Sequence, residues 1–147
     1  MITYHNAFGL TLRQTVGKRT FDLIFSFLGL FLFWWLILLS WIFASIDTKS
    51  NGFFFQKRVG LRGHFFNVIK IKTMRSLPAH NTNITLINDP RITKLGYFFR
   101  KNKIDEIPQL FNILLGQMSF VGPRPDVAGY ADKLVGEDRV ILTIRPG

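Results

Sequence analysis

Cysteine is absent from this chain of 147 residues, and only 9 acidic residues accompany its 19 lysines and arginines. Without cysteine the protein can form neither disulfide bonds nor thiolate metal sites. The P-loop and G-x-G-x-x-G nucleotide-binding motifs are missing as well, and the three histidines lack metal-ligand spacing. The net charge of +10 favours anionic partners, namely nucleic acid, anionic lipid headgroups or phosphorylated substrates.

Charged residues are also missing from Leu23 to Ile46. This run exceeds the roughly 20 residues that a helix needs to cross hydrocarbon. We therefore predict a membrane helix over residues 23–46, preceded by a basic lead-in over residues 1–22. A signal peptide has a shorter apolar region and a small-residue cleavage site, which the sequence does not offer here. A buried helix of a soluble domain is the other alternative, although such helices rarely lack a polar face.

Basic residues flank both ends of the apolar run: Arg13, Lys18 and Arg19 before it, and Lys49, Lys57 and Arg58 after it. The positive-inside rule favours keeping both flanks on the cytoplasmic side. A re-entrant helix allows this, whereas a simple span exports one flank. Re-entry is therefore our expectation, with spanning as the alternative, because no proline interrupts the run to bend it.

Residues 47–147 have the features of a compact α/β domain. Two β-like runs surround the turn VGLRG, and the polar stretch PAHNTNITLINDPRITK is typical of a loop. We expect a helix capped by Asp105 that tolerates Pro108 in its first turn and stops at Gly116. VGPRPD predicts a rigid turn, and a last helix is expected near residues 129–134. The predicted fold is an α/β membrane-associated domain with a membrane helix, a short β-containing segment and interfacial amphipathic helices.

The adjacent acids Asp105 and Glu106 are the first candidates for chemistry. A carboxylate at a helix N-terminus near Arg100 should have a low pKa and stay ionised. It could attack phosphorus or hold a divalent metal against a diphosphate. The structural alternative is that Asp105 caps a helix and Glu106 favours its positive end, and the spacing alone does not exclude it.

Basic side chains form the second candidate set: Arg58, Lys70, Lys72, Arg100 and Arg124. They could cradle a diphosphate, or they could contact lipid headgroups. Two prolines around Arg124 would present its guanidinium rigidly. The aromatic clusters FFF, FF and YFF could stack nucleic-acid bases, but beside an uncharged membrane segment they favour an interfacial belt.

These residues resemble the bacterial sugar transferase family, the small monotopic polyprenyl-phosphate phosphoglycosyl transferases. Four blocks follow in the family's order over about residues 17–147: KRTFDLIFSFLGL, FFFQKRVGLRGHFFNVIKIKTM, RITKLGYFFRKNKIDEIPQLFNILLGQMSFVGPRPD and IRPG. The third block is highly specific. It contains Arg100, Asp105-Glu106 and Pro123-Arg124, so the resemblance favours a functional interpretation of these residues over the structural one.

The resemblance implies transfer of a phosphosugar from a nucleoside diphosphate sugar, usually a UDP-sugar, to polyprenyl phosphate. It implies Mg²⁺ as cofactor and a covalent phosphosugar–aspartate intermediate. By motif position, Asp105 is the expected nucleophile and metal ligand, and Glu106 is its partner in acid–base or positioning work. The residues expected to bind substrate are Arg58, Lys72, Arg100, Pro123 and Arg124. Membrane lipids are expected partners and nucleic acid is not. The expected location is the bacterial cytoplasmic (inner) membrane, with the active site on the cytoplasmic face.

Two features depart from the family. The Ser-Pro break that enforces re-entry is replaced by Trp34-Trp35, and the chain stops at Gly147, where the family normally continues through a Gly-Trp-containing block. We therefore expect a catalytic domain over residues 47–147 that is incomplete at its C-terminus. A catalytically inactive, membrane-bound interaction module is the main alternative function. A basic nucleic-acid binder is a weaker alternative, because the uncharged run and the Asp-Glu pair disfavour it.

Overall fold

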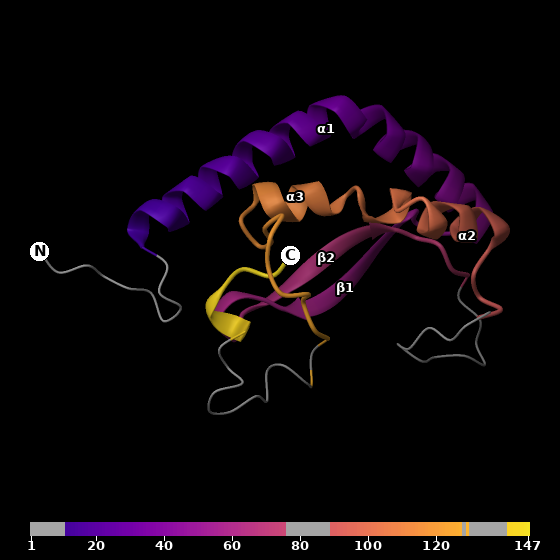
Figure 1. The fold of residues 1–147 in the computed structure, drawn as a ribbon. Coiled ribbons are helices and arrows are strands. Elements are labelled where there is room, and N and C mark those ends of the chain that lie inside the picture. The colour runs from indigo at the N-terminus through magenta and orange to yellow at the C-terminus, as the bar shows by residue number, and fades with distance from the viewer. Residues whose placement is uncertain (1–10, 76–88, 128, 130–140) are drawn as a thin grey trace, which may run out of the picture. The chain divides into compact units, whose positions relative to one another are not determined.

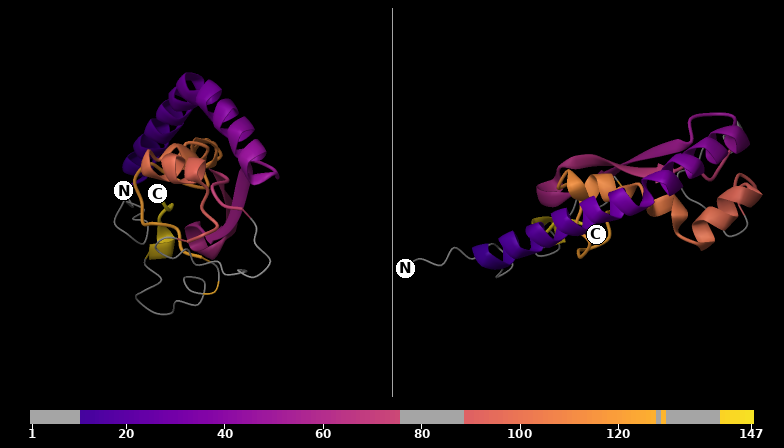
Figure 2. Two further views of the ribbon diagram at one scale, coloured as in Figure 1. Left: turned by 90° about the vertical axis from the view of Figure 1, so that its right-hand side faces the viewer. Right: turned by 90° about the horizontal axis from the view of Figure 1, so that it is seen from above.

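The computed structural model of this chain describes residues 11–75, 89–127, 129 and 141–147 (Figure 1). These residues form two compact units, each assembled from separate stretches of chain. The first unit comprises Met1–Phe31, Gln56–Val68 and Gln109–Gly147, and the second comprises Leu32–Phe55 and Ile69–Pro108. The helices and strands can be followed from two further sides in Figure 2.

Helix α1 runs from Leu12 to Thr48, a length of 37 residues, and is long and apolar enough to cross a membrane. The predicted helix over residues 23–46 is confirmed. The boundary that we predicted between a lead-in and the helix, at residue 22, lies inside α1, because the helix already begins at Leu12. Thr11 and Gln14 form a capping box that starts the helix earlier: Gln14 N–H donates to Thr11 Oγ1 and Thr11 N–H donates to Gln14 Oε1.

Strands β1 (Phe53–Val59) and β2 (Phe65–Ile71) form the predicted two-stranded hairpin (Figure 1). A short 3₁₀ turn, η1 (Leu61–Gly63), joins them. Arg62 and Gly63 both have positive φ angles there, of 57° and 79°. The second glycine of the VGLRG motif, Gly63, therefore occupies the left-handed conformation in the turn of the hairpin.

The core of the first unit gathers around helix α3 (Gln109–Leu114). Buried Val68, Ile113 and Met118 pack together, with Leu110 against them. The helix ends as predicted, because Gly116 has a φ of 79° and its N–H donates to the carbonyl of Ile113. Arg19 also donates to the last carbonyls of α3, those of Ile113 and Leu114, at 2.7 and 2.8 Å.

A buried carboxylate on α1 contributes to the same unit. Asp22 is 1% exposed, and its Oδ1 accepts hydrogen bonds from Ser119 Oγ at 3.0 Å and from the Phe120 N–H at 3.1 Å. Lys18, one helical turn earlier, lies 3.9 Å from Asp22 Oδ2 and also contacts Ser119 Oγ. Because a buried carboxylate is costly without partners, these contacts stabilise the packing of residues 119–120 on the first turns of α1.

The second unit has its own core, formed by Ala44, Ile71 and Phe99. Phe99 belongs to α2 (Lys94–Lys101), a helix that our sequence analysis did not predict. Its signals are present in retrospect. Thr93 is the N-cap and its Oγ1 accepts from Gly96 N–H at 2.8 Å, while Leu95 and Phe99 lie one turn apart on the core face.

Two predicted segments fall largely or wholly outside the described residues. Of the expected loop over residues 78–94, residues 89–93 are described and contain no helix or strand beyond one bridge, between Met74 and Ile92. The helix expected near residues 129–134 lies outside the described part of the chain, apart from Gly129.

Candidate active site

Asp105 lies in a short 3₁₀ turn, η2 (Ile104–Glu106), between α2 and α3. The prediction that it caps a helix is therefore wrong. Lys103 precedes the turn with a φ of 59°, and the N–H groups of Glu106 and Ile107 donate three residues back. Pro108 has no N–H to continue this pattern, so α3 begins only at Gln109.

The Asp105 side chain is buried. The residue is only 8% exposed, and its Oδ1 has no hydrogen-bond partner within the described part of the chain. Burial raises the pKa of Asp105, and the adjacent Glu106 carboxylate raises it further, whereas Lys70 and Arg100 oppose these effects. The predicted low pKa is therefore wrong, because desolvation and a like charge outweigh the two cations.

Glu106 is held by a lysine of strand β2. The Nζ of Lys70 lies 3.0 Å from Glu106 Oε1, and both side chains are partly exposed. Lys70 also lies close enough to Asp105 to lower its pKa. Lys70 is therefore the ion-pair partner of Glu106, and its charge also acts on Asp105. Lys70 is one of the candidate cations of the sequence, but it was not predicted to lie next to the Asp-Glu pair.

Arg100 reaches the site from the last turn of α2. Its Nε donates to Thr73 Oγ1 at 2.8 Å, and its charge lowers the pKa of Asp105. Arg100 was predicted to bind substrate, and its guanidinium is hydrogen-bonded to Thr73 within the unit that contains Asp105. Thr73, which is 5% exposed, was not predicted to take part.

Lys72 belongs to the same unit but has a different neighbour. Its Nζ donates to Ser50 Oγ at 2.7 Å, and its N–H donates to the carbonyl of Gly52. Ile71, the last residue of β2, lies in the core between Lys70 and Lys72. Of these two lysines, the structure brings Lys70 to Asp105 and Glu106.

The remaining predicted ligands, Arg58, Pro123 and Arg124, lie in the first unit. Arg58 is engaged by protein oxygens: its Nε and Nη2 donate to Gln56 Oε1, and its Nη1 donates to the carbonyl of Pro125. Burial lowers the pKa of Arg58, and the neighbouring Arg124 lowers it further. Arg58 therefore holds the segment around Pro125 against β1, and its guanidinium is already occupied by these protein oxygens.

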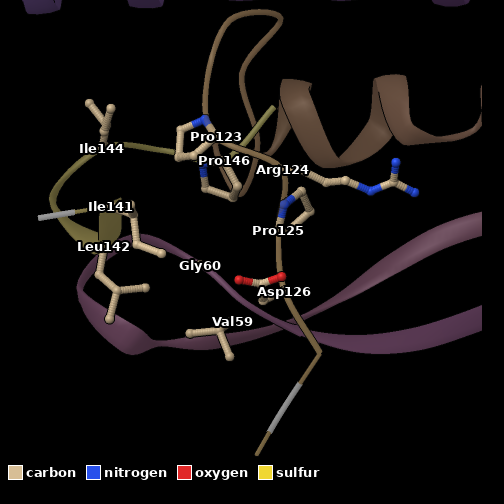
Figure 3. Close-up of a pocket in the computed structure, with 10 residues that line it drawn as sticks. All are labelled: Val59, Gly60, Pro123, Arg124, Pro125, Asp126, Ile141, Leu142, Ile144 and Pro146. Atoms are coloured by element: carbon tan, nitrogen blue, oxygen red, sulfur yellow. The ribbon is translucent and has the colours of Figure 1, made fainter. Parts of the chain in front are cut away.

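Arg124 is exposed, and the backbone on both sides of it is fixed. The carbonyls of Pro123, Pro125 and Asp126 accept hydrogen bonds from Gly147 N–H, Arg58 Nη1 and Val59 N–H. A small cavity of about 10 Å³, room for roughly one water, lies beside this segment. Figure 3 shows the Arg124 side chain extending away from Ile141 and Leu142, which line that cavity. The predicted rigid presentation of Arg124 agrees with this geometry.

Asp105 is the residue of this site that could hold a magnesium ion. Among the residues described, no group of three or more His, Cys, Asp or Glu side chains gathers at one place. Mg²⁺ commonly binds through one or two carboxylates, with waters and substrate phosphates as its other ligands. Asp105 Oδ1 is a buried oxygen that lacks a hydrogen-bond donor, and Glu106 follows it directly. This donor set suits an ion that binds together with a diphosphate.

This chain is similar in sequence to one protein family and to several known proteins. The bacterial sugar transferase family model matches residues 13–147. An uncharacterized sugar transferase of Haemophilus influenzae is 36% identical over 92% of this chain and 32% of its own length. A putative undecaprenyl-phosphate N-acetylgalactosaminyl 1-phosphate transferase of Bacillus subtilis is 35% identical over 86% of this chain and 72% of its own length.

A third relative has a more specific name. The UDP-glucose:undecaprenyl-phosphate glucose-1-phosphate transferase of Xanthomonas campestris pv. campestris is 36% identical over 90% of this chain and 28% of its own length. The chain thus spans about a third or less of the Haemophilus and Xanthomonas proteins. The match to the family model nevertheless covers residues 13–147 of the present chain, which include every residue of the site described above.

Proposed function

Because this chain belongs to the bacterial sugar transferase family, we propose that it transfers a phosphosugar from a nucleoside diphosphate sugar to polyprenyl phosphate. A UDP-sugar is the proposed donor, and Asp105 is the proposed nucleophile. The observation that carries the proposal is the buried Asp105 carboxyl, whose Oδ1 lacks a hydrogen-bond partner in the described chain and whose pKa is raised by burial against the opposing charges of Lys70 and Arg100. The names of relatives that act on undecaprenyl phosphate support the same reaction class.

The first step is an attack by a carboxylate oxygen of Asp105 on the sugar-bearing phosphorus. The new bond is an acyl phosphate, the phosphorus–oxygen bond to UMP breaks, and UMP leaves with the electron pair. In the second step an oxygen of polyprenyl phosphate attacks the same phosphorus. The acyl–phosphate bond then breaks, which restores the Asp105 carboxylate and yields a polyprenyl diphosphate sugar that would start glycoconjugate assembly.

The residues around Asp105 have distinct proposed roles. Arg100 and Lys70 supply positive charge where the transferred phosphoryl group gathers negative charge. Glu106, oriented by its ion pair with Lys70, positions the Asp105 carboxyl or assists in acid–base steps. Asp105 would hold Mg²⁺, which when bound supplies Lewis-acid stabilisation of the diphosphate. Arg124 and Lys72 are proposed phosphate or nucleotide ligands, and Pro123 fixes the backbone before Arg124.

The acceptor of the proposed reaction is dissolved in lipid, so the enzyme must work at a membrane surface. Helix α1 would anchor it there, in the bacterial cytoplasmic membrane. We place the active site on the cytoplasmic face, where nucleotide sugars are made, and we propose that α1 is re-entrant. The basic residues at both ends of the apolar run support this arrangement.

The deciding experiment omits the acceptor. The purified chain is incubated with Mg²⁺ and a panel of UDP-sugars without polyprenyl phosphate, and UMP and intact protein mass are measured. We expect UMP release and the addition of one phosphosugar mass with the correct donor. Asp105→Asn should abolish both signals. The control is Asp47→Asn, which removes an α1 carboxylate that pairs with Arg75, and this variant should retain both signals.

Two outcomes would contradict the proposal. An Asp105→Asn variant that still turns over would exclude Asp105 as nucleophile, because an amide is a poor nucleophile. A parent chain that releases no UMP with any UDP-sugar, with or without polyprenyl phosphate, would reject the proposed activity for this chain and favour a membrane-bound interaction module instead.

A further inference from the structure

Thr73 contacts helix α2 at several points. It lies two residues after the end of strand β2 and is buried, with 5% of its surface exposed. Its carbonyl accepts a hydrogen bond from the N–H of Thr93, the N-cap residue of α2, at 3.2 Å. Its hydroxyl accepts one from Arg100 Nε at 2.8 Å, in the last turn of the same helix. One residue therefore holds both ends of α2.

Gly96 makes this close approach possible. A Cβ on Gly96 would lie 2.1 Å from the Thr73 carbonyl oxygen, so any other residue would push α2 away. Thr93, Gly96 and Arg100 recur at intervals of three and four residues and so share one face of the helix. This face is directed at Thr73. A change in the Arg100 side-chain conformation would break the hydrogen bond from its Nε to the Thr73 hydroxyl.

The Thr73 hydroxyl engages only one edge of the guanidinium. Within the described residues the structure records a hydrogen bond from Arg100 Nε alone, so the two Nη groups have no protein acceptor. An arginine held at Nε presents its Nη groups in a fixed direction, which suits bidentate contact with phosphate oxygens. Asp105 lies close enough to sense the Arg100 charge.

We propose that Thr73 is a positioning residue for the transfer reaction, with its hydroxyl orienting the Arg100 guanidinium toward the phosphate that reacts at Asp105. This inference rests on the proposed function. It assigns to Thr73 an indirect role: the hydroxyl touches neither substrate nor metal, and acts only through Arg100. A lost hydroxyl should therefore matter only while Arg100 is present.

A double-mutant cycle with a conservative rescue tests this role. UMP release is measured for Thr73→Val, Thr73→Ser, Arg100→Gln and Thr73→Val/Arg100→Gln. Thr73→Val keeps the shape but removes the acceptor, and we expect kcat/KM to fall about tenfold, the effect of losing a hydrogen bond to a charged group. Thr73→Ser should recover most of this loss. In the Arg100→Gln background the Thr73→Val change should alter kcat/KM by less than about twofold, because the two residues act as one unit.

The control is Thr20→Val, which removes the same hydroxyl from an exposed site on α1 whose partner is the carbonyl of Val16. It should match the parent within about twofold. Equal losses from Thr73→Val with and without Arg100 would show that Thr73 stabilises the fold generally, and would overturn the inference while leaving the proposed function intact. Inactivity of the parent would instead reject the proposed function.

A second measurement reports the contact without turnover. In ¹⁵N-arginine NMR spectra of the detergent-solubilised chain, the Arg100 Nε–H signal, assigned with Arg100→Lys, should exchange with water slowly in the parent and in Thr73→Ser. In Thr73→Val its exchange should be at least about tenfold faster. Equal exchange rates in all three proteins would overturn the inference whatever the activity.

Discussion

Lys70 Nζ and Glu106 Oε1 lie 3.0 Å apart, so the second carboxylate of the Asp-Glu pair has a cation while Asp105 Oδ1 has no hydrogen-bond donor in the described chain. The two adjacent acids are therefore unlike each other. Glu106 is oriented by a partner in strand β2. Asp105 is buried, and desolvation disfavours its charged form. A bond to phosphorus or to a metal ion would offset this cost.

This difference predicts a pH-dependent stability. The pKa of Asp105 is raised in the folded state, so its contribution to stability is fully present below the unfolded pKa of about 3.9 and is lost as the pH rises through the folded pKa. In detergent with EDTA at pH 7.5, Asp105→Asn should raise the unfolding temperature by about 2–4 °C, equivalent to about 1 kcal/mol. The gain should vanish near pH 4.

The control for this comparison is Asp126→Asn, which changes a half-buried carboxylate of the other unit. Thermal unfolding is followed at several pH values for both variants and the parent. A lower unfolding temperature for Asp105→Asn at pH 7.5, or a gain that does not depend on pH, would contradict the raised pKa of Asp105.

Arg124→Lys should lower kcat/KM for UMP release about tenfold although the charge is kept. A lysine offers a point charge where the arginine fork can hold two phosphate oxygens. Arg62→Lys, at an exposed arginine in the hairpin turn, is the matched control and should stay within about twofold of the parent. Arg124→Lys kinetics equal to those of the parent would restrict VGPRPD to a structural turn.

The direction of α1 in the membrane can be measured with single cysteines, because the natural chain has none. Gln14→Cys lies before the apolar run and His64→Cys lies in the exposed hairpin turn. If α1 is re-entrant, both cysteines should resist an impermeant maleimide in intact cells and react after lysis. Labelling of one cysteine from outside, with the other protected, would establish a spanning helix.

Gly96→Ala should destabilise the protein by about 1–3 kcal/mol, because its Cβ would lie 2.1 Å from the Thr73 carbonyl oxygen and α2 would have to shift. Gly17→Ala is the matched change in α1, where a Cβ meets nothing within 4 Å. It should stabilise the helix by about 0.5–1 kcal/mol. Unfolding midpoints of the two variants should therefore move in opposite directions, and a shift in the same direction would count against the contact at Gly96.

The sequence predicted those features whose signals are local. The uncharged run marks α1, the VGLRG turn marks the hairpin, and Gly116 marks the end of α3. The Asp-Glu pair and Arg100 were identified through the motif that contains them. The predictions of α1, the hairpin and the end of α3 succeed because each depends on residues that lie within a few positions of one another, whereas the roles of Asp105, Glu106 and Arg100 stay predictions.

Helix α2 was missed although its signals are local, but the other features that the sequence did not predict depend on distant contacts. Lys70 and Glu106 are separated by 36 residues, and Thr73 and Arg100 by 27. The spacing of these residues in the sequence does not predict either contact. The pKa of Asp105 was expected in the wrong direction for the same reason, because the burial of a side chain is a property of the packed unit and not of its neighbours in sequence.

The buried Asp22 has a consequence for the order of events during synthesis. Its two hydrogen-bond donors, Ser119 and Phe120, lie 97 and 98 residues further along the chain. At about 5–20 residues per second, translation supplies them about 5–20 s after Asp22 has been made. During that interval the Asp22 carboxylate must stay hydrated, so the part of α1 around Asp22 can reach its final packing only after Ser119 and Phe120 have been synthesised.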